Sequence, residues 1–85
     1  MKPRRLLARL RGGHMQNVRF SDFCALVEMA GFTLLRARRS HRIYGYPAAG
    51  LILSLQDADG YAKPYQIRQF LRTMTRYGLD PRVGR

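Results

Sequence analysis

The chain has 85 residues, of which 46% are hydrophobic, and this suits one small domain with its own core. Sixteen Lys and Arg residues against five acidic residues give a formal net charge of +11, which attracts polyanions such as nucleic acid or an anionic membrane. The single cysteine, Cys24, excludes an intrachain disulfide and a multi-thiolate metal site and fits a reducing cytoplasm; no apolar run is long enough to span a membrane.

The first segment, residues 3–11, predicts a short helix. Leu6, Leu7 and Leu10 recur at helical spacing with arginines between them, and Gly12 and Gly13 end the segment. Such a helix can lie on the rest of the domain by its leucines. Because it is basic and amphipathic, it also fits a membrane surface, although its apolar content is small for that role.

A second helix is expected from Ser21, a good N-cap residue, with Asp22 favourable in the first turn. Its apolar face carries Phe23, Leu26 and Val27, and Gly31 suits the left-handed residue that follows a helix.

From Phe32 on, apolar residues recur at every second position. This predicts strands at residues 32–36, 41–46 and 51–55, with turns at 38–40 and 47–50. The connections are too short for parallel crossovers, so the sheet should be an antiparallel meander. Residues 57–60 are expected to form a loop.

A last helix is predicted from Pro64 to the residue before Gly78. Its apolar face consists of Ile67, Phe70, Leu71, Met74 and Tyr77, and a basic ridge of Arg68, Arg72 and Arg76 follows another face. The expected division is a basic helix and linker at 1–16, a domain at 17–79 and a frayed tail at 80–85.

The expected fold class is α+β, with an α-β-β-β-α core, a three-stranded antiparallel sheet and an extra N-terminal helix. Both core helices should cover one face of the sheet and leave the other face open. By analogy of fold alone, this is the architecture of a double-stranded-RNA-binding domain.

His41 is the residue best suited to catalysis. It follows Arg36, Arg38, Arg39 and Ser40 directly and precedes Arg42. An imidazole transfers protons near neutral pH, and guanidinium groups hold phosphate and stabilise the charge that builds on it, so this segment has what RNA cleavage needs. A lone histidine in a basic strand is more often an ordinary surface residue.

Other polar residues give weaker signals. Lys63 precedes the last helix, where anions bind well, and is equally acceptable as a surface lysine. His14 lies in a linker and is expected to be solvated. Four tyrosines can stack on bases or serve as half-buried packing residues: Tyr44, Tyr46, Tyr61 and Tyr65. No spacing of metal ligands is present, and no cofactor is expected.

Residues 39–47, read as Arg-Ser-His-Arg-Ile-Tyr-Gly-Tyr-Pro, resemble the signature of HicA-type bacterial toxins, roughly Gly-Ser/Gly-His-His/Arg-Ile/Leu-Phe/Tyr-x-His-Pro. The segments at 17–23, 53–56 and 62–71 agree with that family in order and spacing, so the similarity covers about residues 17–79. It implies a double-stranded-RNA-binding-like fold and a metal-independent endoribonuclease that cleaves mRNA. It also implies His41 as the catalytic residue and a HicB-like antitoxin as partner.

Two positions depart from the signature: Arg39 stands in place of its glycine, and Tyr46 in place of its second histidine. The leading interpretation is an mRNA-cleaving toxin with His41 as general base or acid. Phosphate would be bound by Arg36, Arg38, Arg39, Ser40, Arg42 and Lys63. The alternative is a weakly active or inactive RNA-binding module of the same fold.

Overall fold

The computed structural model describes residues 1–79, and the tail expected at 80–85 lies outside this part of the chain. Its elements in chain order are α1 (Pro3–Arg11), α2 (Phe20–Met29), β1 (Thr33–Arg38), β2 (His41–Tyr46), a 3-10 turn (Pro47–Ala49), β3 (Leu51–Ala58), β4 (Tyr61–Ala62) and α3 (Pro64–Tyr77). The expected α+β class with an antiparallel sheet is confirmed.

The strands follow one another as an antiparallel meander in the order β1-β2-β3-β4. The prediction of three strands is therefore wrong by one. Residues 57–60 continue β3 and turn into β4 through Asp59 and Gly60, both with positive φ. An Asp-Gly pair of this kind is a strong hairpin signal, which the expectation of a loop overlooked.

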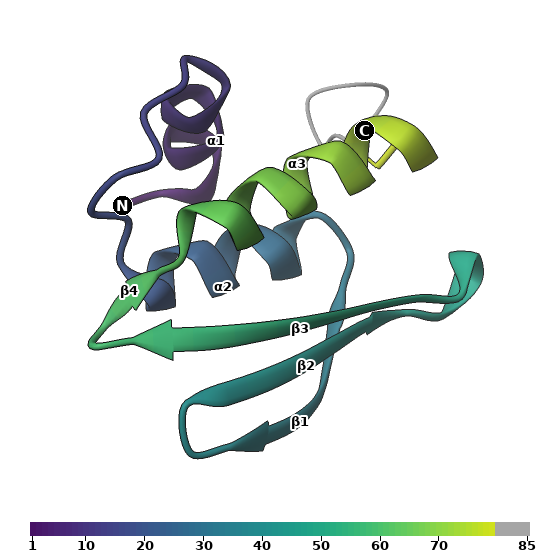
Figure 1. The fold of residues 1–85 in the computed structure, drawn as a ribbon. Helices are drawn as coiled ribbons and strands as arrows, with labels where there is room; N and C mark the ends of the chain where they lie inside the picture. Colours follow the sequence, from purple (N-terminus) through teal and green to yellow (C-terminus); the bar gives the residue numbers. More distant parts are fainter. Residues whose placement is uncertain (80–85) are drawn as a thin grey trace.

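Helices α2 and α3 lie on one side of the sheet, and α1 lies beyond α2 (Figure 1). The layers share one core, in which the Phe23 and Phe70 rings meet edge to face with centroids 5.6 Å apart. Leu6, Leu7 and Leu10 of α1 are buried in the same cluster, so the N-terminal helix contributes to the core of the domain.

Helix α2 begins at Phe20, one residue before the expected N-cap Ser21. The preceding residues run as an extended segment along β4. The Ala62 N–H donates to the Val18 carbonyl at 2.8 Å, and the Phe20 N–H donates to the Gly60 carbonyl at 2.9 Å. This pairing satisfies the first helical N–H without a side-chain cap, and Phe20 is buried as a result.

Strand β1 is exposed along its whole length, because neither face of it is covered. A bulge interrupts its register with β2 between Leu34 and Arg36, and Arg36 and Arg38 place positive charge on it. A bulge and charged side chains are common devices that keep an edge strand from pairing with another chain.

Candidate active site on the open face of the sheet

His41 is the first residue of β2 and is exposed. In the sheet register it lies between Arg38 of β1 and Gln56 of β3. Directly opposed residues in antiparallel strands project to the same face, so these three side chains share the face that the helices leave open.

The arginines of the β1–β2 hairpin gather beside this histidine. Arg36 lies opposite Ile43 in the register, which places it on the face of Arg38 and His41. A hollow of about 320 Å³ is lined by Arg36, Arg38, Arg39, Ser40, His41 and Ile43. The structure thus brings five of the expected site residues together: His41, Arg36, Arg38, Arg39 and Ser40.

Arg39 occupies the turn with a φ of +54°, in the left-handed region that favours glycine. A glycine would adopt this backbone conformation without strain, whereas here the position carries a guanidinium side chain. The next residue is anchored, because its carbonyl oxygen accepts a hydrogen bond of 2.7 Å from the Asp57 N–H.

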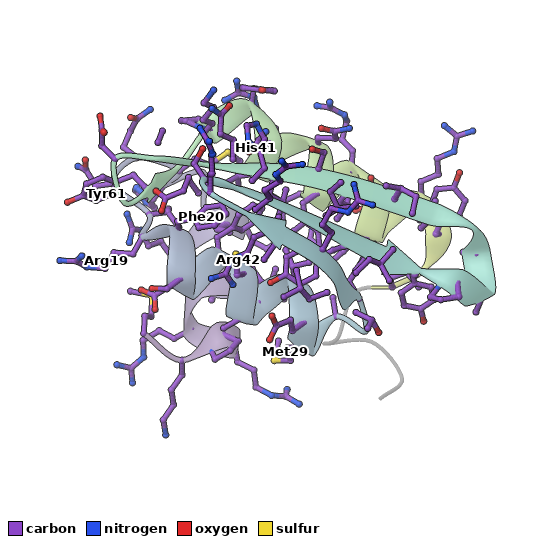
Figure 2. The ribbon with its side chains drawn as sticks, turned by 90° about the horizontal axis from the view of Figure 1, so that it is seen from below. Arg19, Phe20, Met29, His41, Arg42 and Tyr61 are labelled. Carbon is purple, nitrogen blue, oxygen red and sulfur yellow. The ribbon has the colours of Figure 1, made fainter. Side chains whose placement is uncertain are left out.

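Arg42, the next residue after His41, lies on the other side of β2. Figure 2 shows the two side chains pointing away from one another, with Arg42 beside Phe20. The Arg42 guanidinium carbon lies 5.8 Å from the centre of the Phe20 ring, and its interaction with Tyr44 raises the pKa of Arg42. The alternation of a strand is the sequence signal that separates Arg42 from His41.

Tyr44 is fully buried on this helix-facing side, and its hydroxyl donates to Glu28 Oε2 at 2.7 Å. Burial, together with that hydrogen bond, raises the pKa of Tyr44 above its ordinary value of 10. Tyr46 is half-buried on the same side, with its ring 5.3 Å from that of Phe32. The Tyr46 departure from the signature therefore does not alter the face that carries His41.

Lys63 is the N-cap residue of α3, and its ammonium contacts a residue that lies beside His41. It donates to Gln56 Oε1 at 2.8 Å, and Gln56 lies opposite His41. The Lys63 ammonium also lies 6.0 Å from the centre of the Tyr65 ring. Lys63 thus adds a cation at the β3 edge of the face, besides the three guanidinium groups of the β1–β2 hairpin.

A second hollow, of about 430 Å³, opens on the other side of His41. Its lining is His41, Ile52, Ser54, Gln56, Tyr65, Gln66 and Gln69. Apart from His41 and the alternative role considered for Tyr65, sequence reasoning missed this set. The alternation of Ile52, Ser54 and Gln56 along β3 was a signal, but the contribution of α3 required the folded structure.

Gln66 holds α3 against the edge of β3. Its Oε1 accepts a hydrogen bond from the Gln56 N–H at 3.0 Å, and its Nε2 donates to the Ser54 carbonyl at 3.3 Å. Gln66 is only 7% exposed, and its side-chain amide thus replaces the backbone of a neighbouring strand. This fixes the two β3 residues that line the second hollow.

Two other hollows are lined by basic residues and do not include His41. His14 is exposed and lines a separate hollow with Arg9 and Arg68. A larger depression of about 690 Å³ near the end of α3 contains Arg72 and Arg76, and none of its lining residues is a histidine or an acid. Tyr77, expected on the apolar face of α3, is 45% exposed, although Met74, one turn earlier, is fully buried in the core.

Within residues 1–79, no group of three His, Cys, Asp or Glu side chains is arranged to hold a metal ion. No helix in that part of the chain is long and apolar enough to cross a membrane. Models of known protein families, curated proteins and solved structures gave no match to this chain.

Proposed function

We propose that this protein is an endoribonuclease that cleaves mRNA and acts as the toxin of a toxin–antitoxin pair. One observation carries the proposal: an exposed imidazole, His41, lies on an open sheet face beside a hollow lined by three guanidinium groups. The formal charge of +11 supports a polyanionic substrate. The double-stranded-RNA-binding-like fold, the cytoplasmic location and the HicB-like antitoxin belong to the same proposal, through the resemblance of residues 39–47.

In the proposed reaction, neutral His41 takes the proton from a ribose 2′-hydroxyl. The freed oxygen attacks the adjacent phosphorus, and the bond from phosphorus to the 5′ oxygen breaks. The products are a 2′,3′-cyclic phosphate and a 5′-hydroxyl, whose oxygen takes up a proton from water, and the protonated His41 then returns its proton to the solvent. Arg36, Arg38 and Arg39 would stabilise the negative charge that develops on the phosphate oxygens. No metal is required, since these groups supply both proton transfer and charge stabilisation.

Among the proposed phosphate-binding residues, Arg42 is not placed to contact the phosphate beside His41. Its side chain is held by Phe20 and Tyr44 on the opposite face. Its contribution would come from the general positive field, whereas Arg36, Arg38 and Arg39 would contact phosphate directly.

The test is expression of the wild type and the His41→Ala variant, with His14→Ala as a matched control that removes an exposed histidine elsewhere. We expect the wild type and the control to arrest growth and degrade transcripts, and His41→Ala to do neither. RNA binding should persist in His41→Ala and weaken steeply as salt rises. Equal toxicity of all three proteins would refute the role of His41. RNA binding without cleavage by the wild type would establish the non-catalytic alternative.

A further inference from the structure

The hollow between β3 and α3 differs in chemistry from the hollow among the arginines. Its lining includes three primary amides, from Gln56, Gln66 and Gln69, and one serine hydroxyl, from Ser54. It also includes an exposed aromatic ring, that of Tyr65, and the apolar side chain of Ile52, which are 54% and 62% exposed. His41 lines both hollows.

We propose that this hollow binds a nucleobase of the RNA, with Tyr65 as the stacking residue. This inference rests on the proposed function and adds a subsite for the base next to the reacting phosphate. Single-stranded RNA is recognised by stacking of unpaired bases on aromatic rings and by hydrogen bonds to their edges. The side chains around His41 provide these two elements on its β3 side.

The position of the Tyr65 ring is fixed by its neighbours. Its hydroxyl oxygen accepts a hydrogen bond of 3.3 Å from Gln66 Nε2, and Gln66 is in turn bonded to β3. The Lys63 ammonium lies 6.0 Å from the ring centre. A ring that is held at its hydroxyl end yet more than half exposed is suited to stacking, because little side-chain freedom remains to be lost on binding.

The amides provide recognition of the base edge. Gln56 Oε1 accepts a hydrogen bond from the Lys63 ammonium, so the Nε2 group of Gln56 can donate to another partner. Gln69 is exposed on α3, one turn after Tyr65. An amide offers both a donor and an acceptor to a base, as in the bidentate contact of glutamine with adenine. The RNA would therefore cross the open face with its phosphate at the arginines and its base at Tyr65.

The experiment measures binding of short single-stranded 2′-fluoro RNA, which lacks the attacking hydroxyl, and of an abasic strand with the same backbone. The wild type should bind the base-bearing strand more tightly. Tyr65→Ala should lose roughly 5- to 150-fold in affinity for it, since stacking contributes about 1–3 kcal/mol per base. The affinity of Tyr65→Ala for the abasic strand should stay within about twofold of the wild-type value, as expected if phosphate contacts are unaffected.

Two further variants serve as controls. Tyr65→Phe keeps the ring but loses its hydrogen bond to Gln66, so it should retain the preference for the base-bearing strand with a smaller loss of affinity than Tyr65→Ala. Tyr77→Ala removes an exposed tyrosine at the far end of α3 and should change neither affinity. Equal losses for both strands in Tyr65→Ala, or no loss for either, would overturn the base subsite. Because these strands are not cleaved, the result is independent of whether His41 cuts RNA; a wild type that binds neither strand would refute both proposals.

Discussion

Replacing Gln66 by Leu tests how α3 is fixed to the open edge of β3. The substitution keeps a side chain of similar size but removes both hydrogen bonds of the Gln66 amide to β3. It leaves the Gln56 N–H and the Ser54 carbonyl without their partner in a part-buried position. We expect the variant to fold with lower stability and with a loosened β3 edge beside His41.

The loss can be estimated from the two contacts. An unpaired buried N–H or carbonyl costs about 1–3 kcal/mol. The 3.0 Å bond from the Gln56 N–H should contribute more than the 3.3 Å bond to the Ser54 carbonyl, and the apolar leucine returns part of the loss. A net decrease of about 2 kcal/mol in the free energy of unfolding is expected, against a total of about 5–15 kcal/mol for a domain. This corresponds to a melting temperature roughly 8–16 °C lower.

Urea denaturation followed by circular dichroism measures this change. Gln69→Leu is the matched control, because Gln69 is exposed on the same helix and its side chain makes no hydrogen bond within residues 1–79. Its free energy of unfolding should change by less than about 0.5 kcal/mol. A loss of that small size in Gln66→Leu too would show that the amide does not secure the strand edge.

Two other substitutions test local features. Arg39→Gly should raise the free energy of unfolding by about 0.5–1 kcal/mol, because relief of a positive φ outweighs the flexibility that glycine adds to the unfolded chain; a lower urea midpoint would contradict this. The raised pKa of Tyr44 means that the folded protein keeps its phenol proton while the unfolded chain loses it near pH 10. The contribution of Tyr44 to the free energy of unfolding is therefore complete below pH 10. It is lost as the pH rises from 10 through the higher pKa of the folded state, by up to about 1.4 kcal/mol per pH unit. Tyr44→Phe should show a shallower alkaline decrease in unfolding experiments, and an unchanged slope would exclude Tyr44 as its source.

The candidate site was predictable where it depends on neighbours along the chain. His41 and the arginines before it belong to one hairpin, and strand alternation places Arg36, Arg38 and His41 on one face once the register is known. The same alternation removes Arg42 from that face. The second hollow was not predictable in this way, because β3 and α3 meet through the amide of Gln66, and such pairing has no local periodicity.

The sequence by itself determined the α+β class, the order of the main elements, and where two helices end. Periodicity and glycine are local signals: α1 covers the predicted segment, Gly78 takes a left-handed conformation with a φ of +66°, and Gly31 also has a positive φ. Tertiary structure alone decided the start of α2 and the pairing of the outer edge of β4 with residues 18–20, because both depend on hydrogen bonds between residues 18–20 and 60–62. Backbone N–H groups of a buried segment must find acceptors, and which distant acceptors they find depends on how the whole chain packs.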